Sequence, residues 1–192
     1  MHSRRIFLFA AFVLWTCALT AEATAAGPKV RLTTNMGVIE LELDEKRAPI
    51  TVANFLHYVK NGHYVGTVFH RVMRGFMIQG GGFTRDLARK PANAQIRNEA
   101  DNGLKNVNGA IAMARTSDPH SASAQFFINT VDNPNLDHSS KSRRGWGYAV
   151  FGRVVKGMDV VRRIEDMPTA RAGPMGDVPR QTIVIEKAEI LR

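Results

Sequence analysis

Cysteine is almost missing from this chain of 192 residues, since Cys17 is the only one. A single cysteine excludes an internal disulfide. Cys17 also lies inside an apolar run near the N-terminus, so the chain beyond residue 26 contains no cysteine. We therefore expect a domain that is indifferent to an oxidising compartment.

Long apolar runs are also lacking, with one exception. Arg4 and Arg5 precede the apolar run 6–20, and small residues at 21–25 offer cleavage sites. This order is typical of a secretory signal peptide, and the run is shorter than the roughly 20 apolar residues of a spanning helix. We expect residues 1–26 to be a cleaved signal peptide and residues 27–192 to form the domain. A membrane anchor is the alternative.

The same leader suggests where the protein acts. The segment 3–8, SRRIFL, resembles a twin-arginine signal, although an ordinary basic start explains it equally well. The residues before Cys17, Leu14-Trp15-Thr16, lack the small side chains of a lipoprotein signal, so we expect no lipid anchor. We predict a periplasmic protein of a bacterium, with secretion beyond the cell as the second choice.

Acidic residues are in the minority. The chain has 26 Lys and Arg against 17 Asp and Glu, a formal net charge of +9. Such an excess raises the possibility of nucleic acid or an anionic membrane as a partner. The basic residues are scattered, however, and no run exceeds pairs such as Arg143-Arg144. We therefore expect a solvated basic surface, no nucleic-acid partner, and no membrane partner after cleavage.

Metal, phosphate and hydrolase motifs are missing as well. The histidines beyond the leader have neither i, i+4 nor tight zinc spacing. Gly80-Gly81-Gly82 lacks the Lys-Ser/Thr that would follow in a phosphate loop, and is better explained as a backbone turn close to a ligand. Asp137-His138-Ser139 lacks the G-x-S-x-G elbow of hydrolases. We expect neither a metal nor a cofactor.

Periodicity predicts a mostly β chain with two helices. Val52, Phe55, Leu56 and Val59 share one helix face behind Pro49, which predicts a helix over 49–61. A second helix is expected at 158–164. We expect β segments at 30–34, 38–43, 64–72, 76–79, 107–114, 125–129 and 182–191, and an exposed loop at 138–147. Many short strands with two helices favour one domain, a closed antiparallel barrel capped at its ends.

The segment 69–84, FHRVMRGFMIQGGGFT, is the most informative part of the chain. Residues i and i+2 share a face of a strand, so Phe69 and Arg71 are expected to point the same way, as are Met77 and Gln79. A guanidinium, an amide and apolar side chains would then meet on one concave surface. Such a surface suits an extended peptide that carries one bulky apolar residue and one polarised amide.

This segment resembles the core signature of cyclophilins, the peptidyl-prolyl cis-trans isomerases. Two further blocks agree with it, 109–130 (GAIAMARTSDPHSASAQFFINT) and Leu136-Asp137-His138 with 147–152 (GYAVFG). The resemblance runs from about Val30 to the C-terminus. It implies an eight-stranded antiparallel cyclophilin barrel with two helices. It also implies an enzyme that isomerises X-Pro bonds during the folding of exported proteins.

The resemblance assigns roles to ten residues. Arg71 matches the catalytic arginine, which would stabilise the twisted amide, and Tyr148 could meet a peptide carbonyl in place of the histidine of eukaryotic members. The proline pocket would be lined by Phe76, Met77, Phe127 and Leu136, for which ordinary core packing is the alternative. Gln79 and Gln125 match amides that hold Arg71 or the peptide backbone. Ala114 and Arg115 match a rim whose backbone pairs with the ligand.

The expected partners are proline-containing peptides and unfolded or partly folded exported proteins, bound by a monomer. Asn135 stands where cyclophilins usually carry an aromatic that holds cyclosporin, so we expect weak cyclosporin binding. Arg74 stands where proline is common, which affects the local turn. A second hypothesis is a peptide-binding or chaperone-like module in which isomerisation is incidental. The set of Arg71, Phe76, Gln79 and Phe127 favours the enzyme.

Overall fold

The computed structural model describes residues 27–191. The predicted signal peptide, residues 1–26, lies outside the described residues. The strands are β1 (Lys29–Thr34), β2 (Gly37–Leu43), β3 (Thr67–Met73), β4 (Met77–Thr84), β5 (Ala110–Met113), β6 (Phe126–Asn129), β7 (Val150–Lys156), β8 (Thr169–Ala172), β9 (Met175–Pro179) and β10 (Ile185–Leu191). The helices are α1 (Pro49–Lys60), α2 (Met158–Glu165) and the short 3-10 turns η1 (Ala100–Asn102) and η2 (Pro134–Leu136).

Eight strands form one antiparallel sheet in the order β10-β1-β2-β7-β5-β6-β4-β3. The sheet curls until its edge strands approach each other. The amide of Gly66 donates to the carbonyl of Ile185 at 2.8 Å, and the amide of Phe69 donates to Ile183 at 2.9 Å. The expected mostly β fold with eight antiparallel strands and two helices is confirmed, but the barrel is a strongly curled open sheet. Its edge strands β3 and β10 are joined by such single contacts and by the isolated bridge between Val68 and Val184, and they do not form a continuous ladder.

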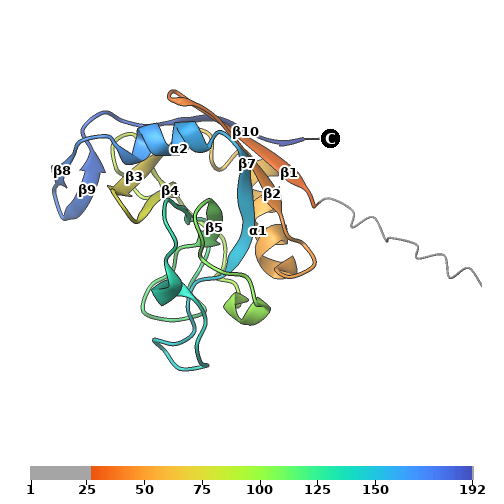
Figure 1. Ribbon diagram of the computed structural model, residues 1–192. Coiled ribbons are helices and arrows are strands. Elements are labelled where there is room, and N and C mark those ends of the chain that lie inside the picture. Colours follow the sequence, from red (N-terminus) through yellow and green to blue (C-terminus); the bar gives the residue numbers. More distant parts are fainter. Residues whose placement is uncertain (1–26, 192) are drawn as a thin grey trace, which may run out of the picture.

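Both helices bury one face in the interior of the curled sheet. Val52, Phe55 and Val59 of α1 and Val161 and Ile164 of α2 are at most 4% exposed and belong to one apolar cluster. Figure 1 shows α2 near the top of the view, above β3, β4 and β5, and α1 at a lower level beside β2 and β7. Burial of such side chains is the main favourable contribution to folding, so each helix is held by the sheet rather than by its own propensity.

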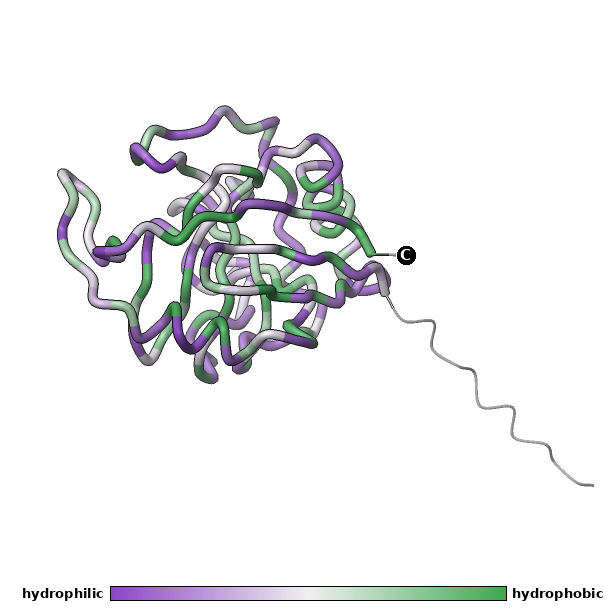
Figure 2. Tube along the Cα trace, turned by 90° about the horizontal axis from the view of Figure 1, so that it is seen from above, coloured by the Kyte–Doolittle hydropathy of each residue, from purple (hydrophilic) through white to green (hydrophobic). Residues whose placement is uncertain are grey.

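Aromatic rings fill the centre of this interior cluster. Phe55 lies between Tyr64, Phe126 and Phe151, with ring centroids 5.1, 5.6 and 5.1 Å away. The hydroxyl of Tyr64 donates to the carbonyl of Ala124 at 2.9 Å, which satisfies the one polar atom that this packing buries. Figure 2 shows hydrophobic and hydrophilic stretches alternating along the chain.

The structure departs from the expected elements in four places. Strand β7 and the hairpin β8–β9 were not expected, the latter because its sequence is too polar to show an apolar period. The glycine triplet 80–82 lies inside β4 instead of a turn. The expected exposed loop holds for Ser139–Arg144, but Trp146 is only 9% exposed because it packs between two histidine rings. Within residues 27–191, no helix is long and apolar enough to cross a membrane.

Candidate active site

Arg71 reaches the outer face of the sheet through an irregularity in β3. Phe69 pairs with Gly80 while Arg71 pairs with Gln79, so β3 carries one residue more than β4 at this point. Phe69 and Val72 therefore both point into the interior cluster, and Arg71 points outward. The expectation that Phe69 and Arg71 share a face is wrong, because a bulge interrupts the alternation of side chains.

A row of paired residues crosses the outer face of five strands. Arg71 of β3 pairs with Gln79 of β4, Gln79 with Phe127 of β6, and Phe127 with Ala112 of β5. Ala112 in turn pairs with Val150 of β7. Directly paired residues project to the same side of a sheet. The fold thus places the guanidinium, the amide and an aromatic ring side by side, although they are distant in the sequence.

A second apolar cluster surrounds this row, separate from the interior one. We call it the outer cluster. Its buried members are Met77, Ala110, Ala112, Phe127 and Val150, with Met73, Phe76, Leu104, Ala114, Leu136 and Tyr148 packed around them and partly exposed. The four residues expected to line a proline pocket all belong to it. Partly exposed apolar side chains on the outside of a sheet form a surface that can receive a ligand.

The turn before β4 presents Phe76 to the outer cluster and is tied down from three sides. The carbonyl of Phe76 accepts hydrogen bonds from the amide of Thr130 at 3.0 Å and from Nδ2 of Asn133 at 2.9 Å. The amide of Gly75 donates to Oε1 of Glu165 at the end of α2, at 2.8 Å. Arg162 donates to the other oxygen of Glu165, also at 2.8 Å. Helix α2 therefore fixes the turn.

Glu165 holds this turn as a charged group. Its side chain is only 7% exposed. Burial by itself would raise the pKa of the carboxyl, but the hydrogen bonds from neighbouring donors, including Arg162 and the Gly75 amide, outweigh it and leave the pKa below its ordinary value. The carboxylate form is the one that the turn requires.

Gln79 and Gln125 bond to each other in this structure. Nε2 of Gln79 donates to Oε1 of Gln125 at 3.0 Å, and the carbonyl of Gln125 accepts from the amide of Ala114 at 3.0 Å. A Cβ atom at Gly82 would overlap the Gln125 side chain, so the glycine in β4 makes room for this amide. The two amides and Ala114 thus line one side of the outer cluster.

Tyr148 connects the remaining expected residues. Its ring lies edge-on to Phe127 with centroids 5.6 Å apart, and the guanidinium carbon of Arg115 lies 4.6 Å above it. The amide of Tyr148 donates to the carbonyl of Leu136 at 2.9 Å, while Nε of Arg115 donates to Gly147 at 2.9 Å. All ten residues expected at the site therefore lie on or beside the outer cluster.

The guanidinium of Arg71 has two contacts within the described part of the chain. Its Nη2 donates to Sδ of Met73 at 3.0 Å, and its Nε lies 3.7 Å from Oδ2 of Asp177 in β9. The side chain is 41% exposed. Sequence reasoning missed Asp177, and it missed five residues of the outer cluster: Met73, Leu104, Ala110, Ala112 and Val150. An i, i+2 relation to Arg71 or to Ala114 could have indicated Met73 and Ala112.

His70 precedes Arg71 but faces away from the outer cluster. It is 6% exposed, and its ring lies 4.5 Å from that of Phe83. Burial, assisted by the charge of Arg71, lowers the pKa of His70 from 6.5 to about 4. The ring is therefore neutral near pH 7, and its role is to pack in the structure.

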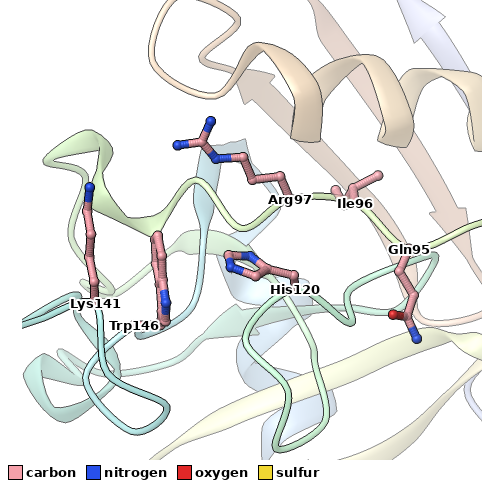
Figure 3. Close-up of a pocket in the computed structure, with 6 residues that line it drawn as sticks. All are labelled: Gln95, Ile96, Arg97, His120, Lys141 and Trp146. Atoms are coloured by element: carbon pink, nitrogen blue, oxygen red, sulfur yellow. The ribbon is translucent and has the colours of Figure 1, made fainter.

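A separate open cleft of about 570 Å³ is lined by Gln95, Ile96, Arg97, His120, Lys141 and Trp146. Figure 3 shows Lys141 and Trp146 side by side, Gln95 at the other end, and His120 between them. None of these residues was expected at the site. Within residues 27–191, no three His, Cys, Asp or Glu side chains are grouped to hold a metal ion.

Comparisons with known proteins identify the family of this chain. The family model of cyclophilin-type peptidyl-prolyl cis-trans isomerases matches residues 29–190. The chain belongs to the cyclophilin family. It is 59% identical to peptidyl-prolyl cis-trans isomerase cyp18 of Streptomyces antibioticus over 162 residues, covering 84% of this chain and 98% of the relative. It is 50% identical to peptidyl-prolyl cis-trans isomerase A of Dickeya dadantii over 191 residues, covering 99% of both chains.

A solved cyclophilin supports the same fold. A Cryptosporidium parvum cyclophilin, crystallised in the presence of the dipeptide Ala-Pro, has a TM-score of 0.70 at 27% identity. The match covers 85% of this chain and 99% of that one. This cyclophilin is accordingly an enzyme of the peptidyl-prolyl cis-trans isomerase class.

Proposed function

We propose that this cyclophilin isomerises X-Pro bonds in exported proteins as they fold, with Arg71 stabilising the twisted amide. The row Arg71, Gln79 and Phe127 on the outer face carries the proposal. It sets a cationic donor beside an apolar cluster whose outer members are partly exposed. No nucleophile, proton transfer or metal is needed for this reaction.

The chemistry follows from amide resonance. Rotation about an X-Pro bond has a barrier of roughly 20 kcal/mol, because the twisted amide loses its resonance. The prolyl nitrogen then regains a lone pair and becomes a hydrogen-bond acceptor. A guanidinium aimed at that nitrogen binds the transition state better than the planar ground state, which is what lowers a barrier. Each tenfold gain in rate requires only about 1.4 kcal/mol.

The substrate would lie across the outer cluster. The proline ring would contact Phe76, Met77, Phe127 and Leu136, and the extended peptide would pass the rim at Ala114 and Arg115. Because the amide of Ala114 already bonds to Gln125, the peptide would pair with the Ala114 carbonyl and the backbone of Arg115. Crystallisation of the Cryptosporidium relative with Ala-Pro is consistent with ligands of this class.

Refolding of a protein whose slow phase is proline isomerisation tests this function. The purified wild type should accelerate the slow phase and Arg71→Ala should not. Arg74→Ala is the matched control, since Arg74 is 80% exposed and pairs with Asp166 instead of facing the outer cluster. If Arg71→Ala accelerates refolding as well as the wild type does, the mechanism fails and a binding module becomes the better description.

Export to the bacterial periplasm is the second half of the proposal. The basic start, apolar run and small residues of 1–26 support it, and the alignment with the Dickeya relative extends over 99% of this chain. Expression of the full chain in a bacterium, followed by cell fractionation and mass measurement, should give a shortened periplasmic protein. A full-length protein retained in the cytoplasm would refute this part.

Cyclosporin should bind weakly, because Asn135 offers an amide where many relatives have an aromatic ring. Asn135 is exposed within η2, next to Leu136 of the outer cluster, so a larger side chain has room. We expect Asn135→Phe to raise the affinity for cyclosporin about tenfold, which calorimetry can measure. Tight binding by the wild type itself would contradict the expectation.

A further inference from the structure

The contact between Arg71 and Asp177 is not part of the sequence-based site. Asp177 belongs to β9, and its Oδ2 lies 3.7 Å from Nε of Arg71, with the two side chains 44% and 41% exposed. Sδ of Met73 accepts a hydrogen bond from Nη2 on another side of the same guanidinium. A thioether and a carboxylate therefore flank the group that would act on the substrate.

Local irregularities place both partners of this ion pair. Arg71 follows the bulge in β3. In the hairpin, Ala170 pairs with Val178 but Ala172 pairs with Met175, so β9 has one extra residue between those pairs. Asp177 lies in this extra stretch with a φ of +58°, a left-handed conformation that is uncommon outside glycine. Bulges re-aim side chains and are over-represented beside active sites.

The amides expected to hold Arg71 have other partners. Gln79, which is paired with Arg71 across the strands, donates to Gln125. Within residues 27–191, the carboxylate paired with Arg71 is that of Asp177. We propose that Asp177 is a positioning residue for Arg71, holding the Nε edge of the guanidinium so that an Nη edge faces the prolyl nitrogen over the outer cluster. This inference rests on the proposed function.

Orientation, rather than stability, is what such a pair can supply. An exposed ion pair contributes little to folding, because water screens the charges. A long, flexible arginine side chain samples many rotamers, however, and a correctly aimed donor lowers the barrier more than a freely moving one. Removal of the Asp177 charge should therefore lower kcat about two- to fivefold and leave the affinity for the ground-state peptide unchanged.

The test compares Asp177→Asn with wild type by NMR exchange on an Ala-Pro peptide, which separates kcat from binding. Asparagine tolerates the left-handed backbone, so the fold is kept. Asp166→Asn is the matched control, because Asp166 pairs with Arg74 at 3.0 Å. We expect kcat to fall in Asp177→Asn alone, Asp177→Glu to restore part of it, and the side-chain Nε resonance of Arg71 to shift only in the Asp177 variants. Salt at 1 M should lower the kcat of the wild type toward that of Asp177→Asn, because the ions screen the Arg71–Asp177 pair.

A double-mutant cycle supplies the decisive comparison. In an Arg71→Lys background, Asp177→Asn should have little further effect, since the group that it positions is gone. Unchanged or faster catalysis in Asp177→Asn would overturn the inference while leaving the proposed function intact, as would equal losses in both backgrounds. Absence of catalysis by the wild type would overturn both.

Discussion

At the residue scale, His70 shows that a residue next to the proposed catalytic arginine need not belong to the site. It adjoins Arg71, yet the bulge in β3 turns the two side chains in different directions, and burial keeps the imidazole neutral. In the unfolded chain this histidine becomes protonated when the pH falls below its ordinary pKa of 6.5. In the folded chain it becomes protonated only when the pH falls to about 4. Stability should therefore be lost as the pH falls from about 6.5 toward 4, by up to about 3 kcal/mol.

The variant His70→Gln should remove that part of the pH dependence. We expect denaturant unfolding to show a shallower loss of stability between pH 6.5 and 4 than in the wild type. His57→Gln is the control, because His57 is exposed on α1. If wild type and His70→Gln lose stability in parallel over this range, burial is not what sets the charge of His70.

The sequence named residues that the fold brings together, although their roles at the site stay predictions. All ten expected residues lie on or beside the outer cluster, and the resemblance was needed to choose pocket over core for Met77 and Phe127. Asp177 could not be predicted, because its place beside Arg71 depends on a bulge in a hairpin without apolar periodicity. Local sequence patterns indicate which residues share one face of a strand. They carry no information about contacts between residues that are distant in the sequence.

At the scale of elements, the glycines of β4 make separable contributions. A Cβ atom at Gly81, whose φ is +83°, would lie 2.8 Å from the ring of Tyr64 and 2.9 Å from that of Phe126. We expect Gly81→Ala to destabilise the fold by about 2–4 kcal/mol through backbone strain and overpacking. At Gly82 the obstacle is the flexible side chain of Gln125, which can move.

Gly82→Ala should therefore act on the site more than on the fold. Displacing Gln125 breaks its hydrogen bond with Gln79, a contact worth about 1 kcal/mol, so kcat/KM should fall about fivefold with a stability loss below about 1 kcal/mol. Thermal unfolding and peptide isomerisation on both alanine variants check this. A Gly82 variant that loses stability as much as Gly81→Ala would show that the two positions are equivalent.

Helix α2 has a second role beyond covering the interior. Glu165→Gln removes the charge that the Gly75 amide and Arg162 share, so the turn that carries Phe76 should loosen. We expect a stability loss of about 2 kcal/mol and weaker binding of proline-containing peptides. Because the pKa of Glu165 is lowered on folding, this contribution is present above the ordinary carboxyl pKa and disappears as the pH falls through the folded value.

Chemical denaturation and peptide titration measure both effects of Glu165→Gln. Asp166→Asn, an exposed neighbour in an ion pair with Arg74, should stay within about 0.5 kcal/mol of the wild type. If Glu165→Gln binds the peptide as tightly as the wild type does, the contact between α2 and the turn does not influence the site.

Elements with strong periodicity were predicted within a few residues. Helix α1 ends at Lys60 against an expected 61, and the hairpin β1–β2 lies as expected. Strand β7 was not expected although it contains part of a recognised motif, because Gly152 interrupts its apolar pattern. Glycine is needed there, since a Cβ atom would lie 2.5 Å from the carbonyl oxygen of Glu42 in the neighbouring strand.

At the scale of the whole molecule, one sheet carries two apolar clusters on its opposite faces. The interior cluster joins the sheet to both helices, and the outer cluster is left partly open beside Arg71. The sequence pattern could not predict this division. Alternation along a strand shows which residues share a face, but it does not show which of the two faces the helices will cover. Curling of the sheet decides it, since only one face becomes the interior.

The most direct test of the account is the rate of cis-to-trans isomerisation of a short Ala-Pro peptide with purified wild type, Arg71→Ala and Arg74→Ala. Circular dichroism should show all three to be folded, because Arg71 is 41% exposed and lies outside the interior cluster. We predict acceleration by the wild type and by Arg74→Ala, and a loss of most acceleration in Arg71→Ala. Full acceleration by a folded Arg71→Ala variant would contradict the central role of that guanidinium.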